Sequence, residues 1–575
     1  MALAVNHLVP RSAILLAVLV AVAACAPAPA PPAPPDAGRS STEAQQRTPR
    51  GTLRIGYAAE PQTLSSKFLT GGGAGEFAWI FNSTLVFFDL DGQPRPLIAS
   101  QIPTRDNGDW VVNADGTMRT TYRLRPNARW HDGAPLTARD FVFAWQVYLD
   151  PDQPAVSRDP ESLMSSVEAT DDQTLVISWK QPYRLANTLG YQKLNPLPRH
   201  LLEEKLAANR TNFAVGEEWN KAYVGSGPFR VQSWEPGSRL IAHAHSEWLL
   251  GPPGVETVEI RFIAEPSVLL ANLFAGELDI VTSPAIGAEA VSAARDQWLP
   301  RGEGTLKTWE TRMSFLDFQR REVPGWQRAV NDLRVRRALM HALDRSAVAE
   351  ALTFGLGSTS DAFVLRADPA FAEVDRAIVK YPYDPARSAA LLTEAGWERP
   401  DGRGVWRNAA GEPLEVDIWA TEENEAVVVA DPWRAIGIAS TPFAIPRVRQ
   451  RDNEFRNNFP GANTGSRSIF PENFTFTSDQ VPKAELGWVG NNRGSLIDPE
   501  VDRLHRIWTN SLDQNERSQA LVALNRRMTD QLGFGPLYYS AEVILAKTNV
   551  RGPVGNYAAQ IGVTWNVHEW EITTP

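Results

Sequence analysis

The chain has 575 residues, which is enough for three or more compact units at about 100–200 residues per domain. Its 57 Lys and Arg against 67 Asp and Glu give a net charge of −10 with no basic block, so nucleic acid is not an expected partner. A hydrophobic content of 43% and a single cysteine exclude global disorder, an internal disulfide and a thiolate zinc site.

The first 24 residues have the features of an export signal. They contain one charged side chain, Arg11, and an apolar run over residues 13–24 that is too short to cross about 30 Å of hydrocarbon. The run ends in Val22-Ala23-Ala24-Cys25, which resembles the bacterial lipobox, where the cysteine is lipidated and becomes the mature N-terminus. We therefore expect residues 1–24 to be a lipoprotein signal peptide and Cys25 to carry a membrane anchor; an ordinary secretory signal with a chance cysteine is the alternative.

The next segment, residues 25–50, has the composition of a tether. Seven of residues 26–50 are proline, and most of the others are small or polar. Such a segment cannot bury a core, and we expect it to hold a globular head away from a lipid surface.

From Gly51 onwards the sequence alternates between strand and helix patterns. Apolar alternation or a short apolar run predicts strands near residues 119–125, 174–177 and 258–262. Capping residues predict several helix starts; they are Thr137 with Asp140, Asp332, Asp384 before Pro385, Asp498 before Pro499, and Asp513 with Glu516. Together these patterns predict a mixed α/β fold with no second membrane span.

Local motifs for catalysis or cofactor binding are missing from the sequence. The glycine-rich stretch at residues 71–75 lacks the Gly-Lys-Ser/Thr that a phosphate-binding loop needs. His243 and His245 have no third metal ligand nearby, and His131-Asp132 precedes a glycine, which favours a turn over an acid/base pair. We therefore assign no catalytic residue, no metal site and no cofactor.

One motif-rich stretch resembles a known family. It contains Trp130-His131-Asp132-Gly133 followed by Thr137-Ala138-Arg139-Asp140, a strand, a tight turn and a capped helix. This resembles the bacterial extracellular solute-binding proteins, family 5, which are the oligopeptide-, dipeptide- and nickel-binding subunits of ABC importers. Further blocks stand in the family's order; they are Glu60-Pro61-Gln62-Thr63-Leu64, Pro196-Leu197-Pro198-Arg199-His200, Val224-Gly225-Ser226-Gly227-Pro228-Phe229, Gly276-Glu277-Leu278-Asp279, Asp332-Leu333-Arg334-Val335-Arg336-Arg337-Ala338-Leu339 and Tyr383-Asp384-Pro385 with Ala395-Gly396-Trp397.

The resemblance implies a two-lobed periplasmic-binding-protein fold (type II, large cluster C-like) with an extra subdomain inserted in lobe one. A ligand would lie between lobes that close by a hinge motion. The expected parts are lobe one at 51–88, 222–310 and 552–575, the inserted subdomain at 89–221, and lobe two at 311–551.

The resemblance also implies a function without catalysis. We expect an extracytoplasmic, lipid-anchored monomer that binds peptides or other small polar solutes. It would deliver them to an ABC permease whose separate ATPase supplies the energy. The alternatives are a receptor for oligosaccharides or another polar solute and, from another class, a surface hydrolase or signalling receptor on the same scaffold.

Four candidate ligand contacts carry over from the family. Glu60 and Pro61 match a lobe-one contact, Trp419 lies at a strand end that lines the far end of the ligand, and Tyr557 resembles a hinge-side tyrosine. For Trp419 and Tyr557, core packing is the alternative.

The family pattern breaks at the place where peptide-binding members carry an aspartate for the ligand's α-amine. Aligning Pro471-Glu472-Asn473-Phe474 with the neighbouring family element puts Arg467 at that place, and no acid lies between Glu454 and Glu472. A buried ammonium without a counter-charge costs several kcal/mol, so the sequence argues against ordinary recognition of a free amine. We hypothesise that Arg467 faces the cleft and pairs with an anionic group; a solvated loop arginine is the alternative.

Overall fold

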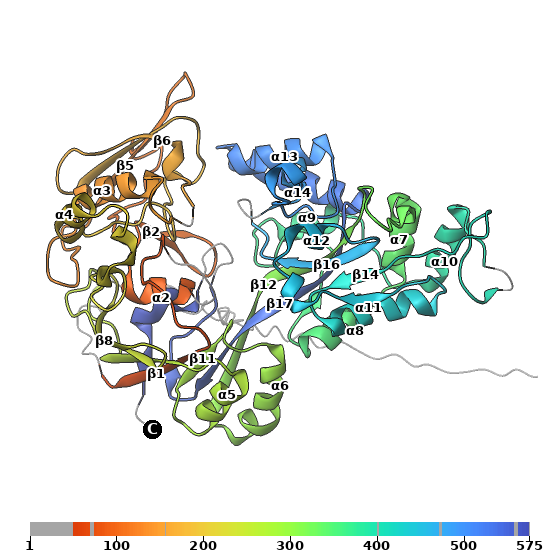
Figure 1. Cartoon of the computed structure of the whole chain (residues 1–575). Coiled ribbons are helices and arrows are strands. Elements are labelled where there is room, and N and C mark those ends of the chain that lie inside the picture. The colour runs from red at the N-terminus through yellow and green to blue at the C-terminus, as the bar shows by residue number, and fades with distance from the viewer. Residues whose placement is uncertain are drawn as a thin grey trace, which may run out of the picture.

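The computed structural model describes residues 50–68, 74–155, 157–399, 402–470, 474–556 and 562–573. Two lobes lie side by side and are joined by the long strands β12 (Gly304–Phe318) and β17 (Phe534–Lys547) (Figure 1). One sheet runs through both lobes in the order β15-β14-β16-β12-β17-β11-β1-β10-β9-β8, with β13 paired to β17. The predicted α/β, two-lobed fold is confirmed.

Lobe one combines an early segment and the final segment of the chain with a separate four-stranded sheet, β4-β5-β7-β6. The elements around the large sheet are β1 (Thr52–Tyr57), α2 (Ala74–Phe81), β8 (Phe229–Glu235), β9 (Arg239–Ala244), β10 (Thr257–Phe262), α5 (Pro266–Phe274), β11 (Ile280–Thr282), α6 (Ala288–Gln297), β18 (Val550–Arg551), the 3-10 helix η11 (Val563–Glu569) and β19 (Glu571–Ile572). Those of the separate part are β2 (Val86–Phe88), β3 (Pro94–Pro96), β4 (Trp110–Val112), β5 (Met118–Arg123), α3 (Ala138–Leu149), β6 (Met164–Ala169), β7 (Thr174–Trp179) and α4 (Arg199–Ala208).

Lobe two holds the other end of the sheet between two apolar cores. Its elements are α7 (Leu333–His341), α8 (Arg345–Thr353), β13 (Ser358–Thr359), α9 (Phe371–Ala377), α10 (Pro385–Glu394), β14 (Ile418–Ala420), α11 (Glu423–Ala435), β15 (Pro442–Ala444), α12 (Asn453–Asn457), β16 (Ala462–Arg467), α13 (Pro499–Asn510) and α14 (Gln514–Asp530). One core packs α7, α10 and α11 against the sheet, and the other packs α13 and α14 against its opposite face.

The strands β12 and β17 change lobes at a β-bulge. They pair from Gly304–Lys547 to Asp317–Phe534, with a register shift between Glu310 and Arg312. A bulge bends a strand, and the expected boundary between 310 and 311 falls at this one. A hinge rotation at the bulge stays a prediction.

The chain passes from lobe two back into lobe one along β17, earlier than the expected boundary between 551 and 552. Val543, Leu545 and Ala546 pack in lobe-one cores, although the expected lobe-two range includes them. The reason is that β17 is one continuous strand, so its last residues pair with β11 of lobe one.

The predicted helix starts are confirmed where capping side chains mark them. Asp332, Asp384, Asp498 and Asp513 each accept hydrogen bonds from backbone N–H groups in the first turn of the helix that follows. The carboxylate of Asp140 reaches back in the same way to the backbone N–H that precedes α3. Within the described ranges, no helix combines the length and the hydropathy needed to cross a bilayer.

Candidate ligand-binding site

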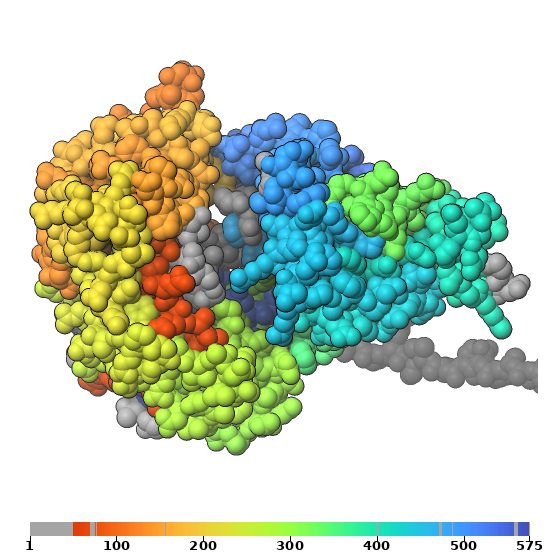
Figure 2. Space-filling view, viewed as in Figure 1, coloured from red at the N-terminus to blue at the C-terminus, as the bar shows by residue number. Residues whose placement is uncertain are grey.

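A hollow separates the two lobes on the face shown in Figure 2. Lobe two presents the parallel strands β14, β15 and β16 near this region, and ligands of open α/β sheets bind outside the carboxyl ends of such strands. The last residue of β16, Arg467, is paired with Met313 of β12, close to the bulge where the lobes meet. This end of the lobe-two sheet is therefore the candidate site.

A row of side chains crosses the lobe-two sheet at one level. The strand register aligns Phe443, Trp419, Asn463 and Asp317 on β15, β14, β16 and β12, and aligned partners project from the same face. The ring of Trp419 lies 4.6 Å from that of Phe443 and 4.9 Å from that of Phe455 on α12, measured between centroids. Trp419 stays half-buried, so this aromatic wall, Trp419 with Phe443 and Phe455, keeps some exposed surface.

At the other end of the row, Asp317 is buried without a full set of partners. Its Oδ2 accepts a hydrogen bond from Asn463 Nδ2 at 3.2 Å, whereas its buried Oδ1 has no partner. Burial raises the pKa of Asp317, and the charges of Arg467 and Arg493 oppose that rise. The carboxylate thus interacts with the charges of nearby arginines but forms no direct ion pair with a described residue.

Arg467 lies against the same sheet face, one side chain nearer the hinge. Its Nη1 donates to Thr475 Oγ1 and its Nη2 donates to the carbonyl of Asn491 at 3.1 Å. Its guanidinium lies over the rings of Phe315 and Phe476, at 5.1 Å and 5.2 Å from the centroids. The side chain is half-buried and belongs to the last residue of β16, so Arg467 does not lie in a loop; ligand contact stays a prediction.

A glycine makes room for this arrangement. Gly465 is aligned with Phe315, and a Cβ atom at residue 465 would lie 2.7 Å from the Phe315 ring. The absence of a side chain at residue 465 therefore lets the Phe315 ring pack closely against β16, where Arg467 lies over it. Burial lowers the pKa of Arg467 to about 10, which leaves the guanidinium positively charged at neutral pH.

Of the lobe-one candidates, Glu60 has a structural role. Its Oε1 accepts from Trp234 Nε1 at 2.5 Å and its Oε2 accepts from the backbone N–H of Gly237 at 2.8 Å, so it ties its loop to the β8–β9 hairpin. The adjacent Pro61 is buried. Tyr557 and Cys25, the other two candidates, lie outside the described residues, and the ligand contacts of Glu60, Pro61 and Tyr557 stay predictions.

The histidine turn that carries the family resemblance is scaffold in this structure. His131 Nδ1 accepts from the backbone N–H of Gly225 at 3.1 Å, and its Nε2 donates to the carbonyl of Gly227 at 3.1 Å. Next to it, Asp132 pairs with His200 at 2.7 Å, and Gly133 adopts a φ of 87°, which favours glycine. The turn therefore contacts two other family motifs, residues 224–229 through His131 and residues 196–200 through Asp132.

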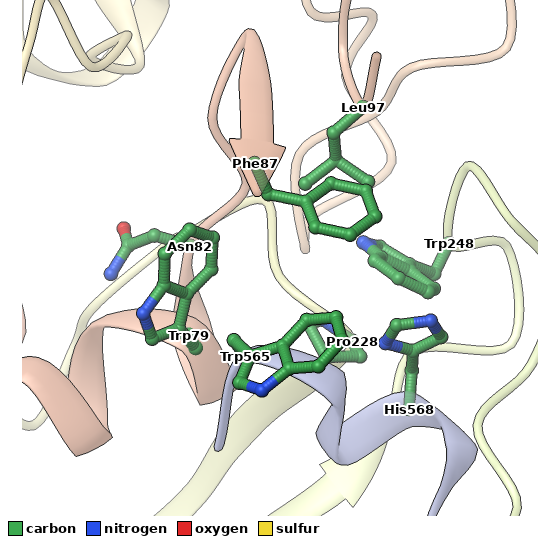
Figure 3. Close-up of a pocket in the computed structure, with 8 residues that line it drawn as sticks. All are labelled: Trp79, Asn82, Phe87, Leu97, Pro228, Trp248, Trp565 and His568. Atoms are coloured by element: carbon green, nitrogen blue, oxygen red, sulfur yellow. The ribbon is translucent and has the colours of Figure 1, made fainter. Parts of the chain in front are cut away.

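An aromatic pocket in lobe one is too small to bind a solute. Figure 3 shows its lining residues, which are Trp79, Asn82, Phe87, Leu97, Pro228, Trp248, Trp565 and His568. The cavity measures about 10 Å³, room for about one water molecule. Its rings pack α2, β2 and η11 together, and Phe87 lies 5.8 Å from Trp565 between centroids. In the described residues, no group of three His, Cys, Asp or Glu side chains could hold a metal ion.

Comparison with known proteins identifies the family. The family model described as bacterial extracellular solute-binding proteins, family 5, matches residues 95–485. The chain belongs to this family.

Individual relatives agree with this assignment. A Brucella ovis protein whose name describes an ABC transporter peptide-binding protein is 26% identical over 367 residues, which cover 61% of this chain and 62% of that protein. The oligopeptide-binding protein AppA of Bacillus subtilis is 23% identical over 534 residues, 90% of each chain. The oligopeptide binding protein of Thermus thermophilus, solved with a pentapeptide, superposes with a TM-score of 0.68 at 22% identity over 91% of this chain and 96% of that one.

Sequence reasoning did not single out Arg456, Arg493 or Asp317, which complete the surroundings of Arg467. Isolated arginines look like solvated surface residues in a sequence, and Asp317 is 150 residues away from Arg467. One signal in the sequence pointed to Arg456. The stretch between Glu454 and Glu472 has no acid but contains both Arg456 and Arg467, a local surplus of positive charge.

Proposed function

We propose that the protein captures peptides or peptide-like solutes between its two lobes outside the cytoplasm and passes them to the permease of an ABC importer. The match to the family over residues 95–485 carries this proposal. The two-lobed fold and the half-exposed polar and aromatic face of lobe two near the interlobe hollow support it. Closure of the lobes on the solute would produce the form that docks on the permease.

The identity of the retained solute tests this proposal most simply. Protein purified under native conditions is denatured, and the released small molecules are analysed by mass spectrometry. Calorimetric titration with pools of random pentapeptides and nonapeptides follows. We expect peptides or peptide-like compounds in the first measurement and saturable binding in the second; absence of both contradicts the proposal.

A second candidate is a receptor for an oligosaccharide or another polar solute of the same importer class. The aromatic wall favours it, because exposed faces of aromatic rings stack on sugar rings as well as on apolar side chains. Recovery of a sugar in the mass spectrum, with no response to the peptide pools, would favour this candidate.

We further propose that the chain is not an enzyme and that a lipid on Cys25 holds it at the membrane. A solute-binding subunit needs no bond-breaking group, since a separate ATPase would supply the energy of transport. Turnover of peptides or esters that one side-chain change abolishes would contradict the first point. For the anchor, we expect the mature N-terminal peptide to carry acyl chains on Cys25 and Cys25→Ser to release the protein from membranes.

A further inference from the structure

Three arginines share one buried carboxylate in lobe two. We call Arg456, Arg467 and Arg493, with Asp317, the arginine cluster. The charges of Arg467 and Arg493 act on Asp317, and Arg456 lies close enough to Arg493 for their charges to repel. None of the ion pairs within 4.0 Å in the described ranges involves these three arginines, so the cluster carries surplus positive charge.

The cluster also has unused hydrogen-bond donors. The Nε atoms of Arg456 and Arg467 are buried and have no partner. Within the described part of the chain Arg456 donates once, to the carbonyl of Gln450 at 3.1 Å, and Arg493 makes no hydrogen bond. Buried donors of native proteins are nearly always satisfied, so these two Nε atoms lack acceptors.

This shortage concerns charge as well as hydrogen bonds. Burial lowers the pKa of Arg456 and Arg467 to about 10, and it also lowers the pKa of Arg493. All three side chains are half-buried, so some of each is open to solvent. An acidic group of a bound solute would supply the missing acceptors and offset the cost of burying these cations.

The aromatic wall adjoins the cluster along the row of aligned side chains. Trp419 is aligned with Asn463, and Asn463 is aligned with Asp317. Phe455, which packs on Trp419, is the residue before Arg456. A single ligand can therefore contact an apolar wall and the guanidinium groups together.

Resting on the proposed function, we infer that lobe two selects solutes with an anionic group: a carboxylate binds to Arg456, Arg467 and Arg493 while an adjoining apolar group lies against Trp419. In a peptide the carboxylate is the C-terminus or an acidic side chain. Recognition then depends on the acid of the solute and not on its amine.

The test uses the full mature protein and four matched pentapeptide pools. Two pools have a free C-terminus and two have an amidated C-terminus. In each pair, one pool contains acidic residues and the other lacks them. We expect the pool with no negative charge to bind at least tenfold more weakly than a pool with one, because it cannot form charge-assisted hydrogen bonds with the guanidinium groups. Comparing the affinity of the pool whose only acid is its C-terminus with that of the amidated pool that contains acidic residues shows which carboxylate binds.

Equal affinity for all four pools overturns the inference and leaves the proposed function intact. Failure of every pool to bind overturns the proposed function and the inference together. Either result can be read from the unchanged protein, so neither depends on the folding of a variant.

A variant series locates the group. Arg493→Gln removes a side chain with no hydrogen bond in the described part of the chain, so we expect an unchanged melting temperature. We also expect the variant to lose the preference for pools that carry a negative charge over the pool that carries none. Arg493→Lys keeps the positive charge and should keep most of the difference. The control is Arg434→Gln, an exposed arginine of α11 that pairs with Asp431. If Arg493→Gln discriminates between the pools as well as Arg434→Gln does, the arginine cluster is not the selective group.

Discussion

Two groups of buried charges, one in each lobe, differ in how fully they are paired. In lobe one, Lys67 and Glu161 are both fully buried, with Lys67 Nζ donating to Glu161 Oε2 at 2.8 Å and to the carbonyl of Gln192 at 2.7 Å. Glu161 Oε1 accepts from the backbone N–H of Leu194 at 2.6 Å. In the arginine cluster of lobe two, Asp317 Oδ1 and the Nε atoms of Arg456 and Arg467 are buried without a partner.

This difference separates scaffold from site. A buried ion pair with all its hydrogen bonds made holds chain segments together and leaves nothing for a ligand. A cluster with spare donors and surplus charge costs stability unless something else binds to it. The Lys67–Glu161 pair is thus part of the framework, whereas the arginine cluster is the surface that we propose a ligand completes. Four measurements can break or sharpen this comparison.

The largest effect is expected at the lobe-one ion pair. Lys67→Met leaves Glu161 buried without its counter-charge, and we expect a loss of ~3–5 kcal/mol in the free energy of unfolding. Urea titration checks this value. The double variant Lys67→Met with Glu161→Leu removes both charges and should recover much of the loss; if it is no more stable than the single variant, the pair is not the cause.

A smaller, pH-dependent effect is expected at the histidine turn. Burial and the neighbouring His245 lower the pKa of His131 to about 3, so the folded protein keeps this side chain neutral. The unfolded chain takes up a proton near pH 6.5, and stability therefore falls as the pH falls through 6.5 towards 3. Between pH 6.5 and pH 5 we expect His131 alone to account for roughly 2 kcal/mol.

Urea titrations at several pH values between 7.5 and 4.5 measure this slope. The buried His245, whose pKa is also lowered, changes stability in the same direction. A free energy of unfolding that is constant or rises over this range as the pH falls would contradict the account of the turn.

In lobe two the expected effect concerns binding. Arg467→Gln removes one charge of the arginine cluster and its contact with Asn491. We expect the affinity for acidic pentapeptide pools to fall about tenfold or more, since one charge-assisted hydrogen bond is lost. Calorimetric titration measures the change. An unchanged affinity would remove Arg467 from the site.

The smallest effect is expected at Glu60. Glu60→Gln keeps an acceptor for Trp234 but replaces one exposed carboxylate oxygen, so we expect a stability change below about 1 kcal/mol and no change in peptide affinity. The same titration with the pentapeptide pools compares Glu60→Gln with the unchanged protein. A tenfold loss of affinity would show that the Glu60 side chain takes part in ligand binding.

The sequence predicted the features that depend on neighbouring residues. The helix starts at Asp384, Asp498 and Asp513 follow from hydrogen bonds within one turn, and they are confirmed. The family motifs also predicted the two-lobed fold, because they stand in order along the chain.

The row across lobe two could not be predicted in the same way. Asp317 and Trp419 are 102 residues apart, and they come to one level only because β16, which follows β14 in the chain, pairs between β12 and β14. A strand order of this kind is a property of the whole sheet. The sequence identified Arg467 and the missing acid but not Arg456, Arg493 or the carboxylate that they surround.

A crystal structure of the protein with the solute that it retains on purification would test the central claim most directly. We predict closed lobes, with an acidic group of the solute within hydrogen-bond distance of Arg467 or Arg493 and an apolar group against Trp419. A solute bound elsewhere, or one whose acidic group points to solvent while the three arginines stay uncovered, would contradict the account.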